Sequence, residues 1–523
     1  MAVKNYPSIF NDVIGPIMRG PSSSHCAASV RIGNLARDMM GGTIKEILIE
    51  FDTKGALATT HESQGSDMGL FGGFLGWKAY DERLVDSVKA IKEAGIKISI
   101  EIKDIGAKHP NTYKLTLKND QEIHEIVAIS SGGGMIEIVK IDDFKVSMVG
   151  DYYETLIYTT DLGVLNYLQS ILSNDEILIH RGMDSFLLEV KAQRFLGEST
   201  LQKIYSEFKT LNIIQLNPVL PVLSWKGMRV PFINYDEMLK YNENKNMDLW
   251  ELAVHYESQR GNIPIEDVIK KMKHIVEIMG KSILRGIKGT HYKDRILDHQ
   301  SGFFKTKMKN KNLLDGGILN QMILYITAMM EIKSSMGVIV AAPTAGACGT
   351  IPGALLGAAH RMMLSEDEVV KAMFAAGMIG IFISNKATFS AEIGGCQAEC
   401  GSASGMAAAG LVTLMKGNTK QAVDAASMAL QNIFGMVCDP VANRVEVPCL
   451  GKNVLAASNA LAAANMGLAN FDAVIPLGEV IEAMNEVGLS IPYELRCTAL
   501  GGLSVTKTSK RLEKKLRNNL LID

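Results

Sequence analysis

Three cysteines in the carboxyl-terminal half of the chain have residue types and surroundings suited to metal chemistry. Cys396 lies in GGCQAEC, and Cys438 and Cys449 bound the stretch CDPVANRVEVPC. Each lies within two residues of a residue that breaks helices: Gly395, Pro440 or Pro448. Thiolates at such breaks can point into a common pocket beside unpaired backbone N–H groups, which is an environment that suits the sulfurs of an iron–sulfur cluster.

Disulfide bonds and zinc explain these cysteines less well than a cluster or plain packing does. Seven cysteines is an odd number, and the start MAVKNYPSIFNDVIG lacks a signal-peptide pattern, so we expect reduced thiols and a cytoplasmic protein. The cysteine gaps do not match the C-x-x-C spacing of structural zinc sites, and no histidine lies near them. Packing stays open, because reduced cysteine is often buried; we expect it for Cys26 and Cys348.

Two histidines lie in stretches that could move protons or hold a substrate. GPSSSHC places Ser23 and Ser24 before His25, and KHPNT places His109 near Asn111. An imidazole titrates near neutral pH and can act as an acid or a base. The serine-rich turn could equally cap a helix, and such a helix start would also attract a carboxylate. Both interpretations of the turn remain open.

Composition excludes several classes of function. Lys and Arg number 54 against 56 Asp and Glu, so we expect no nucleic-acid partner. The apolar stretch from Met336 through Leu356 is interrupted by Pro343, Pro352 and several glycines, so we expect no membrane segment. At 523 residues, two to four domains are expected.

The elements that must position these residues change in character along the chain, and they predict an α+β fold. Residues 1–143 alternate helix and strand patterns, with IKEILIEFDT, IKISIEIKDI and TYKLTLKN as strands and ERLVDSVKAIKEAG as a helix. Residues 144–220 repeat the alternation in miniature, as a small βαββα module. We therefore expect an N-terminal α+β domain followed by a small regulatory module.

The second half is expected to be helical throughout. Three prolines in NPVLPVLSWKGMRVPF mark residues 221–234 as a linker. From residue 235 to 523, apolar residues recur at helical spacing, and GSASGMAAAGLVTLM is typical of closely packed helices. We expect one compact, all-helical domain here, and it carries the three cysteines.

Several motifs together resemble the iron–sulfur-dependent L-serine dehydratase (L-serine ammonia-lyase) family. They are GPSSSHCAASVRIGN, HPNT, SSGGGMI, AAPTAGACGTIPG, GGCQAECGSASGMAAAGL, CDPVANRVEVPC and ALGGL, and they follow the family's order along nearly the whole chain. The resemblance implies a β domain, an ACT-like module and a helical α domain fused in one chain. It also implies a cytoplasmic homodimer in amino-acid catabolism.

The resemblance also implies a cofactor and a reaction. A [4Fe–4S] cluster would be held by Cys396, Cys438 and Cys449, with one iron open to act as a Lewis acid on the hydroxyl of serine. Some relatives close that position with a C-terminal cysteine, but this chain ends in NNLLID, so we expect no such plug. We expect a packing role for Cys400 and assign Cys497 no ligand role.

The roles of the remaining site residues follow from the same resemblance. The predicted catalytic residues are His25, His61, His109 and Asp67, and the predicted substrate-binding residues are Ser23, Ser24, Gln64, Asn111, Thr344 and Lys386. Where the family commonly has His-Gly-Thr-Asp, this chain has QGSD from Gln64 to Asp67. Gln64 cannot exchange protons, so His61, His25 or His109 takes over that task, or the substrate differs from serine.

The sequence therefore leaves three alternative functions open. The first is L-serine dehydration to pyruvate and ammonia with a small amino-acid substrate. The second is a related lyase acting on L-threonine or L-cysteine. The third is a non-catalytic iron–sulfur protein that senses an amino acid.

Overall fold

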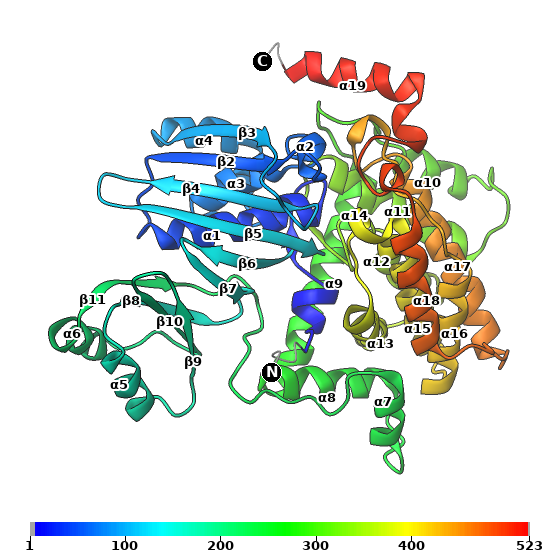
Figure 1. Cartoon of the computed structure of the whole chain (residues 1–523). Helices are drawn as coiled ribbons and strands as arrows, with labels where there is room; N and C mark the ends of the chain where they lie inside the picture. Colours follow the sequence, from blue (N-terminus) through cyan, green and yellow to red (C-terminus); the bar gives the residue numbers. More distant parts are fainter. Residues whose placement is uncertain (1–5, 521–523) are drawn as a thin grey trace.

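The computed structural model describes residues 6–520, and Figure 1 shows two sheet-containing units beside a large helical unit. The first sheet has six strands in the order β3-β2-β4-β5-β6-β7. Its strands are β2 (Glu46–Asp52), β3 (Lys97–Lys103), β4 (Thr112–Lys118), β5 (Ile123–Gly132), β6 (Met135–Ile141) and β7 (Phe144–Met148). Only the β2–β3 pair is parallel, and the chain joins these two strands through a helical crossover.

Helices cover one face of the first sheet. They are η2 (Ser23–Ala27), α1 (Ala28–Met39), α2 (Leu57–Thr60), α3 (Ser66–Phe74), η3 (Glu82–Asp86) and α4 (Ser87–Glu93). Ile32 and Leu35 of α1 share one buried cluster with Ile47, Ile49 and Phe51, which alternate along β2. The sequence predicts one helix over ERLVDSVKAIKEAG, whereas a 3-10 turn and a short α-helix share that stretch.

The second sheet has four strands in the order β11-β8-β10-β9. Its elements are β8 (Tyr153–Thr159), α5 (Gly163–Ile171), β9 (Glu176–Arg181), β10 (Phe186–Ala192), α6 (Glu198–Glu207) and β11 (Thr210–Leu216). One face packs under α5 and α6, and the other shares its core with the first sheet. The sequence prediction ends this module on a helix, whereas the structure has a further strand, β11, which pairs with β8. The prediction also assigns residues 144–148 to the module, whereas these residues form β7, which pairs with β6 of the first sheet.

The rest of the described chain is almost entirely helical. Its longer helices are α7 (Tyr235–Asn242), α8 (Leu249–Gly261), α9 (Ile265–Lys288), α10 (Ser301–Lys309), α11 (Ile318–Ser334), α12 (Thr350–Met362), α13 (Glu366–Lys386), α15 (Ser402–Leu414), α16 (Thr419–Gln431), α17 (Cys449–Leu468), α18 (Leu477–Ser490) and α19 (Lys507–Leu520). The predicted α+β fold, with a β-rich N-terminal part and a helical C-terminal part, is confirmed. None of the helices within residues 6–520 is both long and apolar enough to cross a membrane.

The helical unit also contains short elements, one of which contacts the start of the chain. They are β12 (Ile339–Val340), α14 (Ala391–Gly394), η4 (Gln397–Gly401), η5 (Val441–Asn443), η6 (Tyr493–Leu495) and η7 (Gly502–Val505). Near the N-terminus, β1 (Ile17–Met18) pairs with β12, and η1 (Ile9–Val13) packs on α13. Gly380 permits this approach, because a Cβ there would lie 2.1 Å from a methyl carbon of Val13. The first residues described therefore belong to the helical core.

Candidate active site

The serine-rich turn meets the helical unit at a buried carboxylate. Ser24 Oγ donates to Glu392 Oε1 at 3.0 Å, and Ser390 Oγ donates to Glu392 Oε2 at 2.6 Å. Nδ1 of His25 lies 3.5 Å from Glu392 Oε1. Burial raises the pKa of Glu392, and the hydrogen bonds from Ser390 and Ser24 act in the opposite direction. Residues far apart in sequence therefore form one polar cluster between the two halves of the molecule.

His25 is completely buried, and both of its ring nitrogens have partners. Nδ1 lies 3.0 Å from Ser22 Oγ, and Nε2 lies 2.8 Å from Thr60 Oγ1. Burial lowers the pKa of His25, and the Glu392 carboxylate opposes this shift only in part. A neutral imidazole between a hydroxyl donor and a hydroxyl acceptor satisfies this geometry. His25 is thus held firmly in the wall of the cluster.

The turn around Thr344 extends this cluster. The backbone N–H of Ala345 donates to Ser23 Oγ at 3.1 Å, and Thr344 Oγ1 donates to Glu399 Oε1 at 2.6 Å. Burial raises the pKa of Glu399 to about 7, although the Thr344 hydrogen bond opposes this shift. A carboxyl group with such a pKa can both give and accept a proton near neutral pH.

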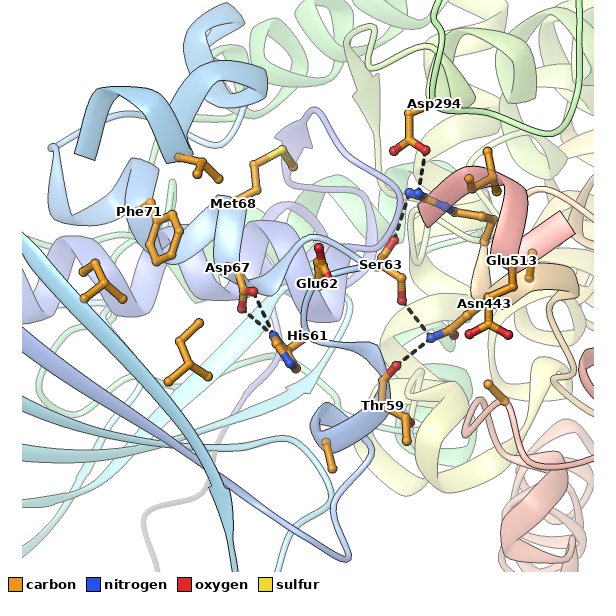
Figure 2. A pocket seen from close by; sticks show the side chains of 18 of the residues that line it. Thr59, His61, Glu62, Ser63, Asp67, Met68, Phe71, Asp294, Asn443 and Glu513 are labelled. Carbon is orange, nitrogen blue, oxygen red and sulfur yellow. Dashed lines mark hydrogen bonds and ion pairs between the residues drawn. The ribbon is translucent and has the colours of Figure 1, made fainter. Parts of the chain in front are cut away.

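His61 and Asp67 form a second acid–base unit at the edge of a cavity of about 760 Å³. His61 Nδ1 lies 2.9 and 2.8 Å from the two carboxylate oxygens of Asp67, as Figure 2 shows, and its ring lies over Phe51 at 5.0 Å. Burial would lower the pKa of His61, but the bond to Asp67 and its charge raise the pKa above its ordinary value. The carboxylate fixes the ring and leaves Nε2 available.

Gln64 is buried, and its amide nitrogen is bonded within the protein. Its Nε2 donates to Asn443 Oδ1 at 3.1 Å and contacts Cys497 Sγ at 3.5 Å. Asn443 Nδ2 in turn donates to the carbonyl of Thr59 at 2.8 Å and to Ser63 Oγ at 2.7 Å, as Figure 2 shows. Gln64 therefore joins the loop before α3 to the segment between Cys438 and Cys449.

Two other buried polar side chains have no such partners. Both amide atoms of Asn111 and the hydroxyl of Ser130 are buried without a hydrogen-bond partner in the described structure. The two residues are neighbours, since the N–H of Ser130 donates to the carbonyl of Asn111 at 3.0 Å. Burial also lowers the pKa of nearby His109, whose Nδ1 accepts from the N–H of Asn111. Unsatisfied buried groups of this kind are expected where a ligand binds.

Lys386 lies apart from the polar cluster around Glu392. It ends α13 and forms an ion pair with Glu482 of α18. The structure gives it no bond to the other predicted site residues within the described chain.

The three predicted cluster ligands approach one another in the helical unit. Cys396 precedes η4, Cys438 precedes Pro440, and Cys449 begins α17; all three are buried. Burial raises the pKa of Cys449 to about 12, and the charge of Cys396 contributes to this rise. Cys396 also acts on Cys438. That these thiols face one common site stays a prediction from the sequence.

Two further thiols lie beside this set. Cys400 lies against Cys396, and that contact together with burial raises the pKa of Cys400. Cys497 lies against Cys438 and likewise raises its pKa. The backbone N–H of Cys497 donates to the carbonyl of Cys438 at 2.9 Å. The sequence gives Cys497 no role, because only the fold brings it to this place.

The donor set consists of buried thiols, which are the ligands that iron–sulfur clusters take. Within residues 6–520, no group of three His, Cys, Asp or Glu side chains is arranged to hold one metal ion. In a four-iron cluster each cysteine binds a different iron, so the thiols need not converge on one point. The positive charges of Lys333 and Lys452 act on Cys449 and would offset an anionic cluster. A buried thiol loses its proton when its sulfur binds a metal ion.

Comparison with known proteins places these features in a family. Residues 244–504 match the family described as Serine dehydratase alpha chain. Over 285 residues, 54% of this chain, it is 35% identical to the Probable L-serine dehydratase, alpha chain, of Bacillus subtilis (strain 168), covering 95% of that protein. The chain belongs to the L-serine dehydratase family.

Two further relatives show that the likeness extends beyond the helical unit. The Probable L-serine dehydratase, beta chain, of the same B. subtilis strain is 36% identical over 156 residues, 30% of this chain and 70% of that protein. The L-serine dehydratase of Streptomyces coelicolor (strain ATCC BAA-471 / A3(2) / M145) is 26% identical over 436 residues, 81% of this chain and 91% of that protein. This chain thus resembles both an alpha and a beta chain.

Several residues that the structure places at the site are not assigned a role by the sequence. They are Thr60, Ser130, Glu392, Glu399 and Cys497. Ser130 lies in SSGGGMI, and Glu392 and Glu399 flank Cys396, so their neighbourhoods carried a signal. Thr60 and Cys497 carried none, because their partners are distant in sequence.

Proposed function

We propose that the protein is a lyase that converts L-serine to pyruvate and ammonia. The observation that carries the proposal is the junction between the two halves, where the buried polar groups of Asn111 and Ser130 lack partners. Neighbouring Gly132 packs on Ser390, and the charge of Glu392 acts on His109. Relatives that match the helical and the sheet-containing parts are named L-serine dehydratases. The site supplies polar groups for a small zwitterionic substrate and groups that move protons.

The proposal includes a [4Fe–4S] cluster held by Cys396, Cys438 and Cys449. Three protein ligands leave one iron open, and that iron would supply Lewis-acid assistance to the departure of the substrate hydroxyl. The burial of all three thiols and the nearby charges of Lys333 and Lys452 support this assignment.

Substrate binding is assigned to groups that lack protein partners. The amide of Asn111 can donate to the carboxylate of serine and accept from its ammonium group, and the hydroxyl of Ser130 can do either. The hydroxyls of Ser23, Ser24 and Thr344 already bond to protein groups, so they build the wall that orients Glu392 and Glu399. Because the wall is buried, it excludes water from the reacting atoms.

Proton abstraction from Cα is assigned to His61. Its Nδ1 is anchored by Asp67, whereas both nitrogens of His25 already have hydroxyl partners. His61 would take the Cα proton as the hydroxyl leaves as water, which gives an enamine. The enamine rearranges to an imine, and water hydrolyses the imine to pyruvate and ammonia. Glu399 is suited to give a proton to the departing hydroxyl, since its pKa is about 7.

The proposal is tested by supplying single amino acids to anaerobically purified protein. L-Serine should release pyruvate and ammonia in equal amounts, faster than L-threonine or L-cysteine releases its 2-oxo acid. Faster turnover of either of the other two would assign the related lyase activity instead. No turnover of any of the three by protein with an intact cluster would contradict the enzyme proposal.

A further inference from the structure

A second cavity, of about 580 Å³, lies where the three parts of the molecule meet. Its walls come from α1, the loop Gly76–Tyr80, the segment Asn217–Pro221 that follows β11, and α9 of the helical unit. The segment 10–17 near the N-terminus contributes apolar side chains. None of the residues of the candidate active site lines it.

The most buried charge at this cavity is Arg31 of α1. Arg31 is 5% exposed. Within residues 6–520 no carboxylate lies at ion-pair distance from it, and the charge of Asp12 acts on it from farther away. Its Nη1 donates to the carbonyl of Gly134 at 2.5 Å and contacts Met135 Sδ at 3.7 Å. Burial lowers the pKa of this guanidinium to about 10. A buried cation with no carboxylate at ion-pair distance is costly, so an anion in direct contact with Arg31 would stabilise it.

Three more cations line the same cavity. Arg37, Lys78 and Lys271 form no ion pair within the described chain, and Lys271 is half-buried on α9. The lining residue with a carboxylate, Asp38, already accepts from the backbone and side-chain amides of Asn217 at 2.9 and 3.0 Å. The cavity therefore presents an excess of positive charge.

The wall also contains the polar side chains of Asn34, Asn217 and His274 and a set of apolar and aromatic ones. This set includes Phe10, Ile14, Trp77, Tyr80, Leu220 and Ile275. We propose that this cavity binds a small organic anion, in which a carboxylate or phosphate group meets Arg31, Arg37 and Lys271 and an apolar body contacts these side chains.

Arg31 links the cavity to the candidate active site. The carbonyl that it holds belongs to Gly134, in the turn between β5 and β6 that follows Ser130. Gly132 of this turn lies so close to α14 that a Cβ there would be 2.9 Å from the backbone nitrogen of Ser390. An anion bound at Arg31 would therefore contact the same guanidinium that bonds to Gly134, in the turn that follows Ser130. This consequence rests on the proposed function, whereas binding at the cavity does not.

Binding is tested by calorimetric titration of the anaerobically purified full chain at low ionic strength. The probes are phenyl phosphate and phenylacetate, which share an apolar body, and inorganic phosphate, which lacks one. We expect saturable binding of one phenyl anion per chain, weaker binding of inorganic phosphate, and loss of affinity at high salt. The tighter of the two phenyl anions identifies the head group.

Variants decide whether the named cations make the site. Lys271→Ala and Arg37→Ala remove groups without hydrogen bonds in the described structure, and each should weaken binding about tenfold. Lys270→Ala, the exposed neighbour outside the cavity, should leave the affinity unchanged. Absence of saturable binding, or equal affinity in all three variants, would overturn the proposal. No turnover is measured, so this outcome is independent of the proposed reaction.

Discussion

At the scale of single residues, the site separates groups that already have protein partners from groups that do not. His25, Ser24 and Thr344 are bonded to neighbours and build the wall. Asn111 and Ser130 are buried with unused hydrogen-bonding capacity. This difference predicts which substitutions change folding and which change substrate affinity.

Asn111→Leu should affect substrate binding more than folding. The amide has no partner to lose, so the free energy of unfolding should change by about 1 kcal/mol or less, while KM for L-serine rises about tenfold or more. Thermal unfolding and steady-state kinetics of the same sample check both values. A large loss of stability with an unchanged KM would show that Asn111 is structural.

Asp67→Asn should change the pH dependence of turnover. Asp67 raises the pKa of His61, so the native enzyme loses its neutral base as pH falls through that raised pKa. Without the carboxylate, the acidic limb of kcat/KM should move to lower pH, and kcat should fall about a hundredfold.

A matched pair on the first sheet provides the control for this experiment. His124 Nδ1 lies 2.8 Å from Asp142 Oδ2, outside the site, and this bond also contributes to a raised pKa of His124. Asp142→Asn should leave the pH profile unchanged. An acidic limb that stays in place in Asp67→Asn would remove His61 from the role of base.

At the scale of elements, the docking of η1 onto α13 holds the start of the chain in the helical core. Gly380→Ala should destabilise the protein by about 1–3 kcal/mol, because the new methyl group meets Val13. Gly280→Ala on α9 meets no atom within 4 Å and should stabilise the helix by up to about 1 kcal/mol. Urea unfolding of both variants measures the contrast, and equal stabilities would contradict this packing.

Elements were predictable where one local pattern decides them. Alternation in IKEILIEFDT gives β2. β11 was missed because its residues continue the apolar spacing of α6, and only pairing with β8 makes them a strand. The same limit applies to the site: the motif positions were visible, but the bonds from Ser24 to Glu392 and from Gln64 to Cys497 depend on the whole fold.

At the scale of the whole molecule, charged residues are buried where the second sheet faces the first. Glu154 lies beside Glu189, which contacts His180 Nε2 at 2.6 Å and Lys191 Nζ at 3.1 Å. Burial and the charge of Glu189 raise the pKa of Glu154 well above its ordinary value. The native state therefore keeps a proton on Glu154 that the unfolded chain releases at lower pH.

This proton links stability to pH. Below the pKa that Glu154 has in the unfolded chain, its carboxyl is protonated in both states, and the free energy of unfolding does not depend on this group. As the pH rises from there toward the pKa of Glu154 in the native state, the free energy of unfolding falls. Glu154→Gln should remove this loss and raise stability at pH 8 relative to pH 5. Urea unfolding at pH 5 and pH 8 checks this prediction, with Glu176→Gln on β9 of the same sheet as control. An unchanged dependence on pH would show that Glu154 does not carry the proton.

The most direct test of the central claim measures iron and turnover in the same samples. Protein is purified without oxygen, loaded with graded amounts of iron and sulfide, and assayed for pyruvate released from L-serine. The account predicts that turnover rises with cluster content to a maximum near four irons per chain, and that Cys438→Ser neither holds the cluster nor turns over serine. Pyruvate formation by iron-free protein, or none by protein with a full cluster, would contradict it.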